Sequence, residues 1–254
     1  MDEAVAEYRQ AIAIRPAYWQ NHNRLGRAFA KAGRFREAAA AYRRVTELQP
    51  DSTVGFNNLG VVASMQGDLA LGLESYTRSA EIAPSASTFS NIGTIHYWNG
   101  NFDSARQAYE KAIALKSDAG MHRNLGDALQ GLHDTAGARM EYLRALDLVK
   151  DQLKVNPKDA ASLSLAALVE VKLGRQADAR THIDAALILA PTDGEVLYRN
   201  AAIAALSGDK TRAFAALKDA IGRGYSVVVA AHDLDLQAVR GLPEFAALVQ
   251  PKNQ

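Results

Sequence analysis

The stretch NRLGRAFAKAGRFREAAAAYRRVTELQP, residues Asn23 to Pro50, decides how the chain folds. Its apolar residues recur every three or four positions, which predicts two amphipathic helices separated at Gly33. A second glycine, Gly26, follows Leu25 inside the first helix, where a larger side chain would push two crossing helices apart. Glycine takes a positive φ without steric cost at a helix end, and proline cannot continue a helix. These residues therefore set packing and turns rather than chemistry.

The same order of residues recurs along the chain. Glycines that follow Leu or Ile are separated by 34, 33 and 33 residues, at Gly26, Gly60, Gly93 and Gly126. Alanine takes this place in two later units, at Ala167 and Ala201. Such a period is typical of a solenoid in which each repeat contributes one supersecondary unit, here an antiparallel helix pair.

The units resemble the tetratricopeptide repeat, whose pattern is W-x2-L-G-x2-Y, then A-x3-F, then P over 34 residues. The match is carried by FNNLGVVA…GLESY…P in 56–84, FSNIGTIH…ARQAY in 89–109 and HRNLGDAL…ARMEY in 122–142. Ser117 departs from it by replacing the proline, and His22 and His122 replace an aromatic residue. The resemblance implies an all-α, right-handed superhelical solenoid of antiparallel helix pairs with a C-terminal capping helix.

Four segments divide this array. Residues 1–18 match only the second helix of a repeat, 19–157 hold units 1–4, 158–227 hold units 5 and 6, and 228–254 form a C-terminal cap and tail. A lone second helix leaves an apolar face uncovered. We therefore expect that the chain is cut from a longer protein, or else is dimerised or capped at this end.

One helix, at about 142–156, gains seven residues over the repeat pattern, which is about two turns. Four apolar residues stay on one face of it: Tyr142, Leu146, Val149 and Leu153. We expect the helix to lengthen and project. Two interpretations remain open, a tolerated extension that alters the stacking angle, and a docking spur or boundary between two sub-arrays.

The charges are nearly balanced, with 29 Lys and Arg against 28 Asp and Glu. No global field therefore favours nucleic acid or an anionic membrane as a partner of this segment. Because no run of about eighteen apolar residues exists, we expect a soluble segment without membrane insertion. The chain has no cysteine, which leaves both the cytoplasm and the periplasm open as compartments.

Motifs for catalysis or metal binding are missing from the sequence. The six histidines are scattered without an H-E-x-x-H pair, and there is no G-x-S-x-G, P-loop or kinase signature. We therefore expect no enzyme activity, no catalytic residue, no metal and no cofactor. In HDLDL, residues His232 to Leu236, we expect Asp233 or Asp235 to cap a helix.

The tail GY…DLDLQAVRGLPEFAALV also resembles the end of bacterial tetratricopeptide domains attached to transcriptional activators, Ser/Thr kinases or nucleotide cyclases. Two functions follow as alternatives. The first is a protein-interaction scaffold that binds a partner protein or peptide in its concave groove. The second is a sensory or regulatory domain that controls an attached DNA-binding, kinase or cyclase module, an inference from fold-level analogy.

One row of residues is the candidate binding site. Two positions before each small residue stand Arg24, Asn58, Asn91, Asn124, Leu165 and Arg199. First helices of stacked pairs line the concave side, so these positions form a ladder on it. An Asn amide can hold a peptide backbone, and arginine can bind a partner's carboxylates. The alternative is that the amides bond to the neighbouring repeat. The predicted groove residues are Arg24, Arg27, Asn57, Asn58, Asn91, Thr94, Arg123, Asn124, Asp127 and Arg199.

Overall fold

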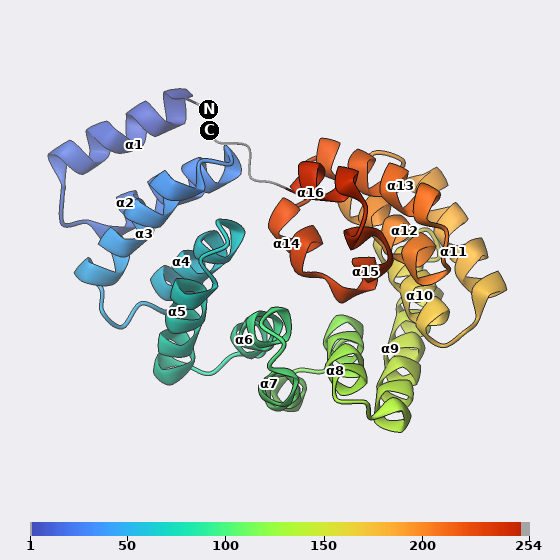
Figure 1. Cartoon of the computed structure of the whole chain (residues 1–254). Helices are drawn as coiled ribbons and strands as arrows, with labels where there is room; N and C mark the ends of the chain where they lie inside the picture. Colours follow the sequence, from blue (N-terminus) through green and yellow to red (C-terminus); the bar gives the residue numbers. More distant parts are fainter. Residues whose placement is uncertain (1, 250–254) are drawn as a thin grey trace. The chain divides into compact units, whose positions relative to one another are not determined.

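A computed structural model describes residues 2–249 as helices joined by short turns (Figure 1). These residues contain no strand. They divide into two compact units, unit 1 ending at Leu115 and unit 2 beginning at Lys116. Each unit stacks antiparallel helix pairs, which confirms the predicted all-α solenoid.

Unit 1 has a single helix followed by three pairs, which are α1 (Asp2–Ile14), α2 (Trp19–Lys31) with α3 (Phe35–Leu48), α4 (Thr53–Met65) with α5 (Leu69–Ile82), and α6 (Ala86–Trp98) with α7 (Phe102–Leu115). Unit 2 has three pairs, which are α8 (Ala119–Gly131) with α9 (Thr135–Val155), α10 (Ala160–Lys172) with α11 (Gln176–Leu189), and α12 (Gly194–Leu206) with α13 (Lys210–Gly222). A C-terminal segment, residues 226–249, follows with α14 (Val227–His232), the 3₁₀ helix η1 (Leu234–Leu236), α15 (Gln237–Arg240) and α16 (Pro243–Val249).

Short polar side chains begin many of these helices. The Ser52 hydroxyl accepts a hydrogen bond from the Gly55 amide at 3.1 Å, and the Asp118 carboxylate accepts one from the Met121 amide at 2.8 Å. Five of the turns within the pairs use a glycine with positive φ, as the sequence predicts: Gly33, Gly67, Gly100, Gly174 and Gly208. In the turn between α8 and α9, His133 takes this conformation with φ 62°, which costs a residue with a Cβ roughly 1–2 kcal/mol.

Each of the first four pairs is closed by a contact between glycine and a tyrosine ring. A Cβ atom at Gly60 would lie 2.7 Å from the Tyr76 ring, and one at Gly126 would lie 2.5 Å from the Tyr142 ring. The last two pairs carry alanine at the small position and a shorter aliphatic residue at the tyrosine position, where Ile183 and Leu217 are fully buried. The two positions therefore compensate each other in volume, as close packing requires.

The long helix α9 spans 21 residues, which confirms the predicted lengthening. Leu146 and Val149 are buried in one core cluster with Ala166 and Val169 of α10. The opposite face of the helix is open to solvent along its length, and Val155 at its end is 88% exposed. One face of the added turns therefore packs in the core, through Val149 and Leu153.

Candidate peptide-binding site

The predicted groove residues of unit 1 lie on α2, α4 and α6, the first helices of its three pairs. Arg24 and Arg27 are exposed on α2. Within residues 2–249 neither side chain makes a hydrogen bond or ion pair. Both guanidinium groups are therefore available to a carboxylate from outside the chain.

The asparagines of unit 1 differ in their partners. Asn58 Nδ2 donates to Asn23 Oδ1 at 2.9 Å, which joins α4 to α2. Asn57 Oδ1 accepts a hydrogen bond from Thr88 Oγ1 at 3.1 Å, which joins α6 to α4. Asn91 is half-buried, and among the described residues it has no hydrogen-bond partner. Bonds between repeats thus engage the Asn57 and Asn58 amides, whereas no described residue engages Asn91.

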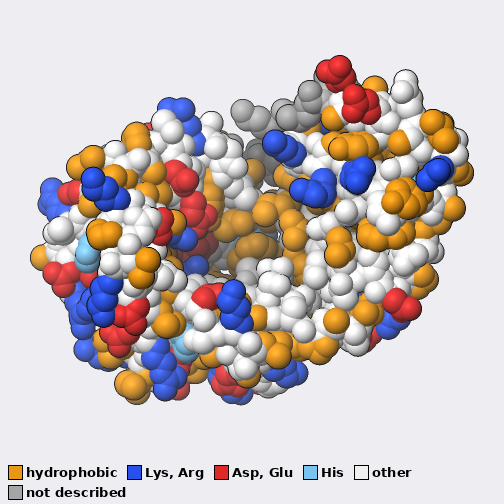
Figure 2. Space-filling view, turned by 180° about the vertical axis from the view of Figure 1, so that it is seen from behind, with side chains coloured by type: hydrophobic (Ala, Val, Ile, Leu, Met, Phe, Trp, Pro, Cys, Tyr) orange, Lys and Arg blue, Asp and Glu red, His pale blue; other side chains and the backbone are white. Residues whose placement is uncertain are grey.

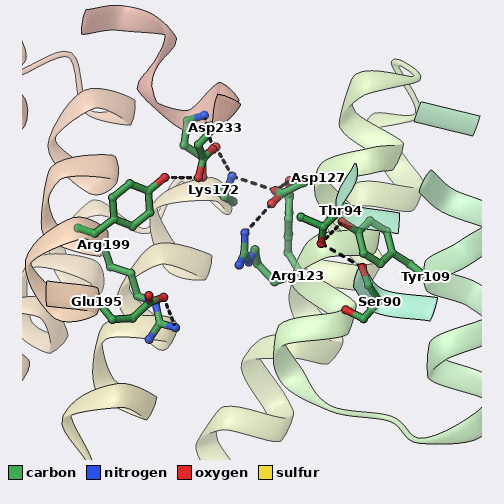
Figure 3. A network of polar contacts seen from close by, with 12 residues as sticks. Ser90, Thr94, Tyr109, Arg123, Asp127, Lys172, Glu195, Arg199 and Asp233 are labelled. Atoms are coloured by element: carbon green, nitrogen blue, oxygen red, sulfur yellow. Dashed lines mark hydrogen bonds and ion pairs between the residues drawn. The ribbon is translucent and has the colours of Figure 1, made fainter. Parts of the chain in front are cut away.

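Thr94 also lies on α6, one turn after Asn91. Its hydroxyl donates to the Ser90 carbonyl oxygen at 3.0 Å and accepts from the Tyr109 hydroxyl at 3.1 Å (Figure 3). These bonds hold Thr94 against its own helix pair.

The remaining predicted residues belong to unit 2. Asn124 on α8 is half-buried, with no hydrogen bond in the part of the chain described. Arg199 on α12 donates to the Ala161 carbonyl and to Ser164 Oγ, both at 2.9 Å, and pairs with Glu195 at 2.9 Å. Arg199 therefore joins α12 to α10. Of the predicted arginines, Arg24 and Arg27 lie in unit 1, and Arg123 and Arg199 lie in unit 2.

A cluster of buried charges lies on the first helices of unit 2. Lys172 Nζ at the end of α10 lies 2.9 Å from Asp127 Oδ1 of α8 (Figure 3). Lys172 also pairs with Asp235 of η1. Arg123 Nη1 donates to Asp127 Oδ2 at 3.1 Å, and the Tyr142 hydroxyl donates to Asp127 Oδ1 at 2.7 Å. The Lys172 and Asp127 side chains are only 7% and 6% exposed. We call Arg123, Asp127, Lys172 and Asp235 the Lys172 cluster.

The neighbouring charges set the pKa values in the Lys172 cluster. Burial lowers the pKa of Lys172, but the Asp127 and Asp235 carboxylates raise it above its ordinary value. Burial raises the pKa of Asp127, but Lys172 and Arg123 hold it below its usual range. For Asp235, burial and the nearby carboxylates of Asp233 and Asp127 outweigh Lys172 and raise the pKa to about 7. Asp235 therefore titrates near neutral pH.

This raised pKa predicts a stability that depends on pH. A carboxyl group with a higher pKa in the folded chain than in the unfolded chain favours folding most below the unfolded pKa. That contribution is lost as the pH rises through the folded pKa. We expect the thermal unfolding midpoint to decrease as the pH rises from about 5 to about 8, because Asp235 loses its proton in this range. The change Asp235→Asn should make the midpoint depend less on pH. An equal slope in wild type and variant would contradict the assignment.

The sequence predicted a helix cap at Asp233 or Asp235, and only Asp233 caps a helix. Asp233 Oδ1 accepts a hydrogen bond from the Asp235 amide at 2.9 Å at the start of η1. The prediction is therefore confirmed at Asp233, and Asp235 pairs with Lys172 instead. No local pattern identifies Lys172, because Lys31 holds the equivalent place in the first pair and is exposed.

The surface carries charges of both signs. On the face drawn in Figure 2, acidic and basic side chains gather in small mixed groups rather than in one field. Residues 2–249 contain no group of three His, Asp or Glu side chains able to hold a metal ion. In the same range, no helix combines the length and apolar character needed to cross a membrane.

Comparison with known proteins places these repeats in a family. A family model described as tetratricopeptide repeat matches residues 23–87, 124–194 and 164–226, and a second model with the same description matches 85–116. No curated protein sequence matches the chain significantly.

Solved structures share the fold at low sequence identity. A tetratricopeptide repeat protein from Parabacteroides merdae is 15% identical with a TM-score of 0.66, over 93% of this chain and 91% of that one. A chain of the APC/C hetero-tetramer Cut9–Hcn1 is 16% identical with a TM-score of 0.62, over 98% of this chain and 46% of that one. The chain thus spans about half the length of this second structure. Pseudomonas aeruginosa pilF is 19% identical with a TM-score of 0.53, over 90% of this chain and 96% of that one. The repeats, their glycine–tyrosine contacts and the family models agree, and the chain belongs to the tetratricopeptide-repeat family.

Proposed function

We propose that the chain is a protein–protein interaction scaffold that binds an acidic, extended segment of a partner on the first helices of unit 1. One observation carries this proposal. The helices α2, α4 and α6 contain no Asp or Glu, whereas α3, α5 and α7 each contain two. Among these first helices only α2 carries arginine or lysine, and no acidic group on α2, α4 or α6 neutralises its basic side chains.

The arginines of unit 1 divide in the same way. On the second helices, Arg44, Arg78 and Arg106 pair with carboxylates one turn away. On α2, Arg24 and Arg27 lack such acceptors. Opposite charge on a partner raises the association rate and selects acidic sequences.

The uncharged residues beside the arginines suit an extended backbone. Asn91 carries a donor and an acceptor that no described residue engages, and Val61 is 42% exposed on α4, one turn after Asn58. We propose that the Asn91 amide bonds to the partner's main chain, that Val61 contacts an apolar side chain, and that the arginines bind its carboxylates.

An array of random twelve-residue peptides tests this proposal. Wild-type protein is expected to retain acidic peptides, and the variant Arg24→Ala/Arg27→Ala to bind them about fivefold more weakly or worse. Each exposed ion pair contributes up to about 1 kcal/mol, and salt should weaken the wild-type binding by screening.

The matched control is Arg36→Ala/Arg43→Ala. It removes two exposed arginines without ion pairs from α3, the second helix of the same pair. We expect it to bind like wild type. Equal weakening by both double variants would mean that net charge, and not the first-helix face, governs binding.

A further inference from the structure

The C-terminal segment of unit 2 has apolar contacts that close the stack. Leu236, Val239 and Phe245 are buried in one core cluster with residues of α12 and α13, including Leu217. A solenoid needs such a cover on its last pair. The apolar residues are sufficient for this role.

The two aspartates of the segment, Asp233 and Asp235, make polar contacts in addition to the apolar contacts that cover the last pair. Asp235 pairs with Lys172 of α10, and Lys172 in turn pairs with Asp127 of α8. The Tyr198 hydroxyl of α12 donates to Asp233, and Arg240 Nη2 donates to the Asp233 carbonyl at 2.8 Å. Buried ion pairs lose hydration, and apolar residues of similar volume often stabilise as well or better. Covering the last pair therefore does not explain Asp235, nor the bond that Asp233 accepts from Tyr198 in addition to capping η1.

The three first helices supply the groups that hold these two carboxylates. Lys172 of α10 pairs with Asp235, and the Tyr198 hydroxyl of α12 donates to Asp233. Arg123 of α8 pairs with Asp127 (Figure 3), and its charge also interacts with the charges of Asp233 and Asp235. Asp127 pairs with both Arg123 and Lys172 and so fixes their positions. Arg123 Nε is buried and has no partner in the described part of the chain, which leaves a spare donor in the site. Without Asp233 and Asp235, the Arg123 and Lys172 cations would share the single carboxylate of Asp127.

We infer that this face of unit 2 is a second binding site for an acidic segment, and that the chain's own Asp-Leu-Asp-Leu stretch, residues 233–236, occupies it as an internal ligand. The external ligand has two carboxylates separated by one residue and followed by an apolar side chain. This inference rests on the proposed function, since it assigns acidic segments to first-helix faces. It adds that the site in unit 2 binds a partner only in competition with the C-terminal segment.

The test uses the full chain and a fluorescent peptide with the sequence of residues 230–240, AAHDLDLQAVR. In the variant Asp233→Asn/Asp235→Asn the internal ligand loses its charges, and its apolar residues remain. We expect this variant to bind the peptide at least about tenfold more tightly than wild type, because a tethered segment competes at high effective concentration. The Asn-substituted twin of the peptide is expected not to bind.

Circular dichroism first verifies that the variant is folded, and Asp235→Asn alone replaces it if it is not. Equal peptide affinity in the folded variant and in wild type, or equal binding of both peptides, would overturn the inference.

Arg24→Ala/Arg27→Ala separates the two proposals. We introduce that change into wild type and into Asp233→Asn/Asp235→Asn. It should weaken binding of the array peptides and preserve the roughly tenfold gain in affinity for the AAHDLDLQAVR peptide between the two backgrounds. Array binding of unchanged strength would overturn the proposed function, and loss of the tenfold gain would overturn this inference.

Discussion

Replacing Lys172 by methionine is expected to lower the free energy of unfolding by about 3–5 kcal/mol, because a broken buried ion pair leaves uncompensated buried charge. Asp127 and Asp235 would then face each other without the cation that lies between them. The loss should be larger at pH 8 than at pH 5, since Asp235 becomes protonated at lower pH. Urea denaturation at both pH values measures it.

Lys154→Met is the matched control for this change. Lys154 pairs with Asp151 at 2.7 Å, but the two side chains are 76% and 69% exposed. Exposed pairs contribute about 0–1 kcal/mol, so this variant should unfold almost like wild type. Similar losses for both lysines would show that Lys172 is not buried between two carboxylates.

Gly60→Ala is expected to destabilise the chain by about 1–3 kcal/mol through overpacking, because its Cβ would lie 2.7 Å from the Tyr76 ring. Alanine gains up to about 1 kcal/mol over glycine in a helix, which offsets only part of this loss. Chemical denaturation of the variant measures the balance.

The later repeats indicate how to restore the contact. They combine alanine with a shorter aliphatic residue, as Ala201 and Leu217 do. Adding Tyr76→Leu to Gly60→Ala should therefore cost less than the sum of the two single changes, and the double-mutant cycle gives the coupling energy. Simple additivity would contradict the compensation in volume.

The sequence was sufficient for the fold because the residues that define each pair are local and repeated. Gly60 and Tyr76 lie one helix apart, and the same distance separates the equivalent residues in every unit. The seven added residues likewise predict a longer α9. The packing of Val149 against α10 depends on the next pair, and the spacing within α9 contains no information on it.

The binding site was less predictable, because its contacts join residues of different repeats. Asn58 and Asn91 hold equivalent positions, yet Asn58 bonds to Asn23 while Asn91 has no described partner, because Asn57, the residue equivalent to Asn23, accepts its hydrogen bond from Thr88. Asp235 lies 63 residues from Lys172 in the sequence, so only the folded chain brings their charges together. The assignment of the groove residues to peptide binding stays a prediction.

The measurement that tests the central claim most directly is site-specific photo-crosslinking of the strongest acidic array peptide. A benzophenone-bearing residue is placed at position 61 on α4 or, as control, at position 77 on α5; Val61 and Thr77 are both exposed. If the first helices of unit 1 bind the peptide, adducts form from position 61 and not from position 77. Equal adducts at both positions, or adducts from position 77 alone, would contradict the account.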